Sequence, residues 1–218
     1  MPAEKHVPVE ATAGANDPRT LHALNAIIAA TEPPLPGAER AVLGEGPEGA
    51  AIAFVGEQPG DQEDRQNRPF VGPAGQLLNR AMAEAGIVRD RVYVTNAVKH
   101  FKFEQRGKRR IHQRPTAGEV KHYRRWLFKE LEFVAPRVVV ALGATAVLAL
   151  AGRALPISRN RGEMRFGAWR GFVTVHPSYL LRVPDREARQ HAYEEFVSDL
   201  KRIHSLAERG EPLVSAAS

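Results

Sequence analysis

Residues 138–151 read VVVALGATAVLALA, and this stretch decides the fold class. Val138 to Leu142 form a short, continuous apolar run, which is typical of a strand buried on both faces of a sheet. Gly143 turns the chain, and the residues from Ala144 to Ala151 then have the composition of a small buried helix. A buried strand that leads through a glycine directly into a helix predicts a parallel sheet covered by helices.

The same alternation of strands and helices extends outward from this stretch. Thr116 and Glu119 form a capping box and Asp185 is a helix N-cap, so both places mark helix starts. Strands are expected at 51–55, 91–95 and 172–175, and helices at 18–30, 72–85, 116–134 and 185–210. The sequence therefore predicts an α/β fold, a three-layer α/β/α sandwich around a central, mostly parallel, four-stranded sheet.

This sandwich is expected to be a single domain over residues 17–207. Residues 1–16 are rich in alanine, proline and small polar residues, which predicts a disordered tail, and residues 208–218 form a second tail. The first 16 residues lack the apolar core of a secretory signal, and no apolar run approaches the ~20 residues that span a bilayer. We therefore expect a cytoplasmic monomer with no membrane partner.

The chain of 218 residues contains no cysteine. This excludes disulfides, thiolate zinc sites, cysteine-ligated iron–sulfur clusters and a cysteine nucleophile. Any metal would need histidine or carboxylate ligands, and no metal site is predicted.

The net charge of +6 is concentrated in one segment. Seven basic residues and one acidic residue lie between Lys99 and Arg114, so this segment alone carries the net charge of the chain. A solvated surface loop is the usual role of such a run. Because a basic loop can also bind phosphates, we expect DNA contacts there from Lys108, Arg109 and Arg110.

The turn GEQPGD at residues 56–61 follows the first predicted strand, and ligands bind beyond such strand ends in open α/β sheets. Its glycines and proline make a tight turn that lets the backbone approach a ligand. Glu57, Gln58 and Asp61 place two carboxylates and an amide near one site. Taken alone, a strand-to-loop turn with surface acids is the simpler explanation.

Three further positions supply an aromatic ring, an amide and an imidazole. Phe70 precedes a glycine-rich helix start and can stack on a base, while Asn96 at a strand end can donate and accept, as the O4 and N3–H edge of uracil requires. His176, fixed by the following proline and close to Ser178, lies at another strand end and can donate to a leaving base. Each has an ordinary alternative as a core, turn or cap residue.

The basic segment ends in RRIH at residues 109–112. An unprotonated imidazole is a nucleophile, so His112 on this cationic loop is a candidate for covalent catalysis. A surface histidine without a role is the more common outcome, and for the residue taken alone that alternative stays open.

Together and in this order, the segment 56–75, Asn96, the KRRIH sequence at 108–112 and the HPS sequence at 176–178 resemble the uracil-DNA glycosylase superfamily. The resemblance is closest to its UdgX-type uracil-DNA cross-linking branch, near family 4, and it covers residues 40–203. It implies uracil excision in DNA repair, on single-stranded DNA at least as well as on duplex, because flipping the base costs less there.

The resemblance also implies roles for single residues. It makes His112 the residue that attacks C1′ of the deoxyribose, so that the protein stays covalently attached to DNA after one turnover. Glu57 would stabilise the developing positive charge or polarise His112, and His176 would contact O2 of uracil. Uracil contacts are further implied at Gln58, Asp61, Phe70 and Asn96.

Relatives in this superfamily carry a 4Fe–4S cluster, and here the sequence departs from them. The resemblance aligns their cysteine ligands with Ala29, Glu32 and Tyr123, and a further ligand with His100. Without cysteines the cluster is expected to be absent, and cleavage of the glycosidic bond needs no iron.

Three alternatives remain from the sequence. A glycosylase that turns over would release the DNA. A non-catalytic single-strand-binding module would explain the basic segment but not the polar strand ends. A nucleotide-binding α/β protein would explain the fold, although the sequence has no Walker-type motif, and its Gly-x-Gly-x-x-Gly match at residues 44–49 precedes the first predicted strand instead of following one.

Overall fold

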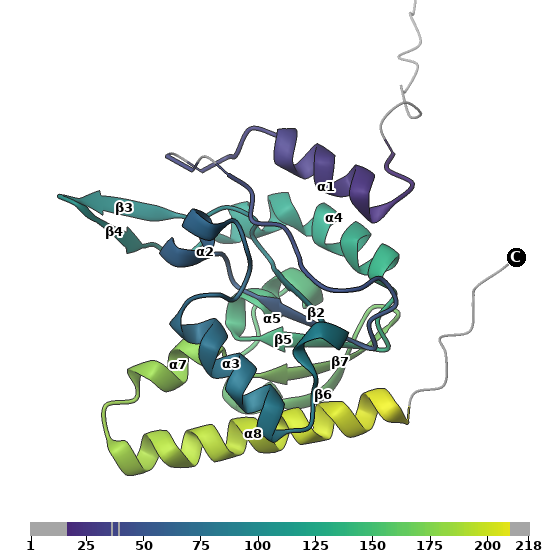
Figure 1. Cartoon of the computed structure of the whole chain (residues 1–218), viewed down its shortest axis with the longest axis vertical. Helices are drawn as coiled ribbons and strands as arrows, with labels where there is room; N and C mark the ends of the chain where they lie inside the picture. Colours follow the sequence, from purple (N-terminus) through teal and green to yellow (C-terminus); the bar gives the residue numbers. More distant parts are fainter. Residues whose placement is uncertain (1–16, 36, 39, 210–218) are drawn as a thin grey trace, which may run out of the picture.

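Five strands form the central sheet, in the order β2-β1-β5-β7-β6 (Figure 1). The structure is a computed structural model that describes residues 17–35, 37, 38 and 40–209. The strands β2, β1, β5 and β7 run parallel, and β6 pairs antiparallel with β7 at one edge. The strands are β1 Ile52–Gly56, β2 Tyr93–Asn96, β5 Val138–Leu142, β6 Gly162–Phe166 and β7 Trp169–Thr174.

Helices cover both faces of this sheet, so the predicted three-layer α/β/α sandwich is confirmed (Figure 1). One face carries α1 (Leu21–Ala30), α4 (Ala117–Val134) and α5 (Ala144–Ala151). The opposite face carries α3 (Pro73–Glu84), α7 (Pro177–Arg182) and α8 (Arg186–Glu208). The connections hold the short helices α2 (Asp61–Gln66), η1 (Arg89–Arg91) and α6 (Ile157–Asn160).

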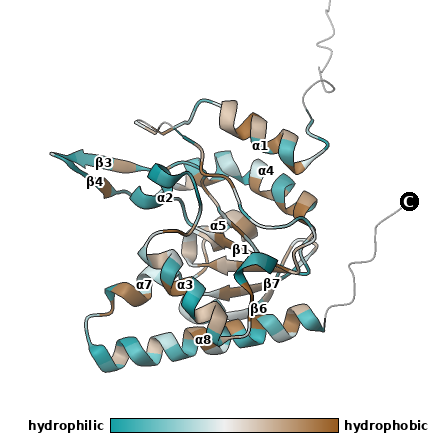
Figure 2. Ribbon diagram, in the orientation of Figure 1, coloured by the Kyte–Doolittle hydropathy of each residue, from teal (hydrophilic) through white to brown (hydrophobic). Residues whose placement is uncertain are grey.

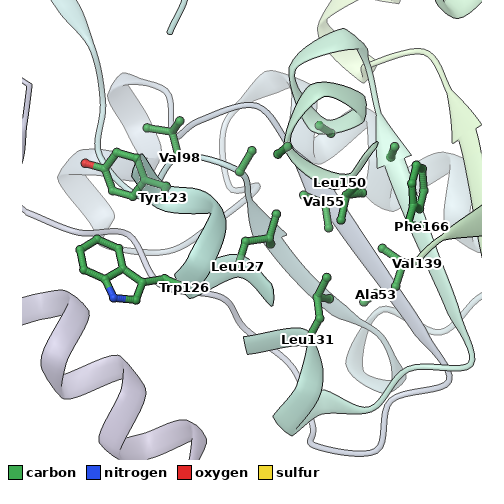
Figure 3. Close-up of a cluster of buried hydrophobic side chains, with 14 of the residues drawn as sticks. Ala53, Val55, Val98, Tyr123, Trp126, Leu127, Leu131, Val139, Leu150 and Phe166 are labelled. Carbon is green, nitrogen blue, oxygen red and sulfur yellow. The ribbon is translucent and has the colours of Figure 1, made fainter. Parts of the chain in front are cut away.

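Alternate residues of the buried strands face the two helical layers. Val139 packs with the layer of α4 and α5, whereas Val140 packs with the layer of α3 and α8. Figure 3 shows the first of these clusters, in which Val55 of the sheet belongs with Leu127 and Leu131 of α4. Figure 2 shows hydrophobic colour on the central strands and hydrophilic colour along much of α8. Because both faces of each central strand are buried, the sequence shows continuous apolar runs there.

The sheet has five strands, and the predicted number of four was wrong. The missed strand, β6, contains no continuous apolar run, since only Gly162 and Phe166 of its five residues are buried. It lies at the edge of the sheet and turns at Gly167, where φ is 60°, into β7. An edge strand of mixed polarity is not found by searching for apolar runs.

The basic segment, which we expected to be a loop, forms an antiparallel hairpin of β3 (Phe103–Arg106) and β4 (Arg109–His112). Phe103 pairs with His112 at the base of the hairpin, the end away from its turn. All eight strand residues are exposed or half-buried, so the hairpin has no apolar pattern that would predict it. In Figure 1 the hairpin projects from the body of the protein.

In the part of the chain that the structure describes, no helix is long and apolar enough to cross a membrane. The predicted tail at 1–16 and residues 210–218 of the second predicted tail lie outside the described residues. Helix α8 begins at the predicted Asp185 cap and ends at Glu208.

Candidate active site

A cleft of about 1200 Å³ opens at the carboxyl ends of the parallel strands. Its walls come from the turn after β1, the end of β2, the loop before α3, the starts of α5 and α7, and the end of β4. The basic residues predicted to bind DNA, Lys108, Arg109 and Arg110, are not among the lining residues. Eight of the predicted site residues line this cleft together, namely Glu57, Gln58, Asp61, Phe70, Asn96, His112, His176 and Ser178.

The carboxylate of Glu57 lies at the centre of the polar groups in this cleft. Its Oε1 lies 3.4 Å from Nε2 of His112, and its Oε2 accepts a hydrogen bond of 2.5 Å from the hydroxyl of Thr145. Nε of Arg114 lies 4.0 Å from the same Oε2. Thr145 was not among the predicted site residues, although its place two residues after the glycine at the end of β5 is a signal that could have identified it.

His176 is held in a defined orientation at the start of α7. The backbone N–H of Ser178 donates to Nδ1 of His176 over 3.2 Å, so Nδ1 is an acceptor. Burial lowers the pKa of His176 to about 4, and the ring is therefore neutral at pH 7. A neutral imidazole with an acceptor at Nδ1 carries its proton on Nε2, which makes Nε2 a donor in the cleft.

Phe70 and Asn96 approach each other across Gly56. A Cβ atom on Gly56 would lie 2.6 Å from Cζ of Phe70 and would also meet Oδ1 of Asn96, so only glycine allows this arrangement. Asn96 ends β2 and is almost fully buried, with 3% exposure. The rings of Phe70 and His176 lie 6.3 Å apart, centroid to centroid, at an angle of 32°. An aromatic face, an amide and an imidazole donor therefore share one end of the cleft.

The side chain of Gln58 binds the base of the hairpin. Its Nε2 donates to the backbone oxygens of Lys102 and Gln113, and its Oε1 accepts from the backbone N–H of Lys102. These two residues flank the hairpin directly. Gln58 therefore lines the cleft as predicted, but its amide joins the turn after β1 to the segment that carries His112.

Asp61 and Arg110, predicted to contact uracil and DNA respectively, contact each other. Nε of Arg110 donates to Asp61 over 2.5 Å, and its Nη1 donates to Asp64 over the same distance. The guanidinium also lies over the rings of Phe101 and Phe103, 5.2 and 5.1 Å from their centroids. Arg110 thus fixes the hairpin to α2, while Lys108 and Arg109 at the hairpin turn are exposed.

Two positions that the resemblance aligns with iron–sulfur ligands are in contact. Nδ1 of His100 lies 2.7 Å from the hydroxyl oxygen of Tyr123, and both side chains are buried. Burial raises the pKa of Tyr123 and lowers that of His100 to about 4, so at pH 7 this hydrogen bond joins a neutral phenol and a neutral imidazole. A phenol and an imidazole are not the thiolates that hold an iron–sulfur cluster, so this site does not fit one. Among the described residues no group of three or more acidic, histidine or cysteine side chains could hold a metal ion.

Comparisons with known proteins identify the family of this chain. The family profile described as "Uracil DNA glycosylase superfamily" matches residues 43–201. A "Type-4 uracil-DNA glycosylase" of Thermotoga maritima is 40% identical over 157 residues, which cover 71% of this chain and 78% of that protein. Proteins of the same description from Archaeoglobus fulgidus and Pyrobaculum aerophilum are 34% and 36% identical, over 78% and 67% of this chain and 84% and 76% of their own lengths. With its sheet, its strand-end cleft and these matches, the chain belongs to the uracil-DNA glycosylase superfamily.

Proposed function

We propose that this protein excises uracil from DNA and then captures the DNA through His112. The observation that carries the proposal is the pairing of His112 with Glu57 at the cleft that holds Phe70, Asn96 and His176. A histidine paired with a carboxylate at such a cleft supports a nucleophilic role for His112. The relatives described as type-4 uracil-DNA glycosylases support the excision step.

Recognition of the base follows from the chemistry of the pocket. The ring of Phe70 stacks on uracil, the amide of Asn96 pairs with its O4 and N3–H, and Nε2–H of His176 donates to its O2. As the glycosidic bond breaks, its electron pair leaves with uracil. The donor from His176 stabilises this negative charge, while Glu57 stabilises the positive charge on the sugar.

In the capture step, the unprotonated Nδ1 of His112 gives its electron pair to C1′ as the bond from C1′ to N1 of uracil breaks and the electron pair of that bond leaves with uracil. The proton on Nε2 passes to Glu57, whose Oε1 lies 3.4 Å away. The product is a neutral imidazole joined to the sugar by a C–N bond, which water does not readily cleave. One protein molecule is therefore consumed for each uracil.

The DNA strand is held by groups around the cleft. Lys108 and Arg109 on the exposed hairpin turn contact phosphates, and Ser178 at the start of α7 contacts the backbone beside the flipped nucleotide. Tyr179 and Leu181 also line the cleft and expose 49% and 46% of their surface, so they can fill the space that the flipped base leaves. Single-stranded DNA is at least as good a substrate as duplex, because no base pair has to be broken.

We further propose that the protein acts in the cytoplasm as a monomer and without an iron–sulfur cluster. Neither the excision step nor the capture step uses a metal. The full sequence contains no thiolate for a cluster, and the positions aligned with its ligands include the hydrogen-bonded pair of His100 and Tyr123.

A glycosylase that releases its product is the second candidate, since Glu57 could equally orient a water molecule, and the relatives bear the glycosylase name. A denaturing gel with uracil-containing DNA separates the two. A protein–DNA band that survives SDS and heat supports capture. An alkali-labile abasic site without that band supports hydrolysis. If neither product forms, the protein would be a non-catalytic DNA-binding module.

A further inference from the structure

One buried acid in the cleft wall has no role in the chemistry described above. Glu63 lies in α2, is only 9% exposed, and accepts two hydrogen bonds from backbone groups. Its Oε1 accepts from the N–H of Gly72 over 2.8 Å, and its Oε2 accepts from the N–H of Gly60 over 3.2 Å. The side chain therefore joins two loops that are not adjacent in sequence.

Both loops contribute residues to the cleft that holds the proposed base pocket. Gly60 ends the turn that carries Glu57, and Gly72 lies two residues after Phe70. Both glycines allow a close approach to the carboxylate. A Cβ atom on Gly60 would lie 2.7 Å from Oε2 of Glu63, and one on Gly72 would lie 3.0 Å from Oε1.

Phe70 needs such support, because its backbone is in an unfavourable conformation. Its φ is 57°, in the left-handed region that bulky residues rarely adopt. The carbonyl group of Phe70 also packs tightly against Gly75 at the start of α3, because a Cβ atom on Gly75 would overlap it. The backbone of Phe70 thus packs against Gly75 of α3, and the chain two residues later is held by Glu63 through the N–H of Gly72.

We propose that Glu63 is a positioning residue for uracil recognition. It sets the spacing between the turn that carries Glu57 and the loop that carries Phe70, and it acts on the base only through Phe70. This inference rests on the proposed function, since it assigns Phe70 to the stacking contact.

The test is Glu63→Gln, which preserves size but presents an NH₂ group to one of the two backbone donors. Losing a hydrogen bond to a charged acceptor predicts a fall of about 10-fold or more in the single-turnover excision rate at subsaturating DNA, and a similar fall in inhibition by free uracil. In a Phe70→Ala background, Glu63→Gln should have little further effect on either quantity. Glu132→Gln, at an exposed acid of α4, is the matched control and should behave as wild type.

Equal losses from Glu63→Gln in the presence and absence of Phe70 would overturn the proposal, because they would show a merely structural role. If Glu63→Gln does not fold, Gly72→Ala takes its place. It keeps the carboxylate but forces it away from the Gly72 N–H, and it should show the same dependence on Phe70. A wild-type protein that does not excise uracil would refute the proposed function itself. Wild-type excision that Glu63→Gln leaves unaffected would refute only the role of Glu63.

Discussion

Nε2 of His112 lies 3.4 Å from Oε1 of Glu57, although the two residues come from a peripheral hairpin and from the turn after the central strand β1. The proposed base pocket and the proposed nucleophile thus belong to different parts of the fold. This separation means that recognition and capture can be tested independently, by substitutions that affect one and spare the other.

The first prediction concerns His112→Ala. The substitution removes the attacking nitrogen and leaves room for water at C1′, while the residues that contact uracil remain. The SDS-stable adduct should disappear, and free uracil with an alkali-labile abasic site should take its place. Paired gels, one with SDS and one after alkali, measure both products. By contrast, Glu57→Gln should reduce both products, because it changes the stabilisation of the transition state. An adduct that persists in His112→Ala would assign the attack to another residue.

The second prediction concerns the hydroxyl that orients Glu57. Thr145→Val keeps the shape of the side chain and removes the 2.5 Å hydrogen bond to Oε2. A lost hydrogen bond to a charged group predicts a rate of adduct formation about 10-fold lower. Rapid-quench kinetics in a single turnover measure this rate. Thr145→Ser, which keeps the hydroxyl, should restore most of it, and equal rates for valine and serine would show that the bond is not needed.

The third prediction separates two kinds of basic residue on the hairpin. If Lys108 and Arg109 contact phosphates, replacing both with alanine should reduce the slope of log affinity against log salt concentration by roughly 2. Arg110→Ala should leave that slope nearly unchanged, because its guanidinium is occupied by Asp61 and Asp64. It should instead lower the yield of adduct, since the hairpin loses its attachment to α2. Fluorescence anisotropy across a salt series, with His112→Ala as the common background, would measure the slopes. A fall of about 1 for Arg110→Ala would contradict the structural assignment.

The fourth prediction concerns stability in acid. Burial lowers the pKa of His100 to about 4, whereas the exposed group titrates near 6.5. As the pH falls from about 6.5 to 4, the unfolded chain takes up a proton that the folded chain does not, so the free energy of unfolding decreases through this window. For His100 the full loss is at most roughly 3 kcal/mol, and the buried His176 acts in the same direction.

Urea unfolding at pH 7 and pH 4.5 measures this loss. His100→Gln can still accept a hydrogen bond from Tyr123 but cannot be protonated, so the variant should lose less stability between the two pH values than wild type. His191→Gln, at an exposed position of α8, is the control and should lose as much as wild type. An identical loss for His100→Gln and wild type would exclude His100 as the group responsible.

The fifth prediction concerns cofactors. Protein purified under anaerobic conditions should be colourless, and its activity should be unchanged by an iron chelator, because the chain has no thiolate to ligate a cluster. Iron analysis and the visible absorption spectrum measure this directly. Stoichiometric iron with a visible absorption band would show that other ligands hold a cluster.

The four parallel strands and their ends could be predicted from the sequence because their signals are local. The apolar run before Gly143 and the polar residues after each strand are visible within a few positions. The hydrogen-bond partners of Gln58 and Arg110 could not be predicted in this way. Gln58 bonds to Lys102 and Gln113, 44 and 55 positions away, and the partners of Arg110 lie 49 and 46 positions away. Such pairs follow from tertiary packing, and an arginine in a basic run looks the same whether it meets a phosphate or an aspartate.

Lys102 and Gln113 flank the hairpin, and the contact between them bears on whether the hairpin could be gained or lost as a unit. The backbone N–H of Gln113 donates to the carbonyl of Lys102 over 2.9 Å, so the chain leaves and re-enters the domain at nearly the same point. A chain joined directly from Lys102 to Gln113 would lose residues 103–112, His112 among them, and would retain Phe70, Asn96 and His176, which lie on other segments. Under the proposed capture mechanism, gaining these ten residues would turn an enzyme that releases its product into one that is consumed by it, with the same residues recognising the base.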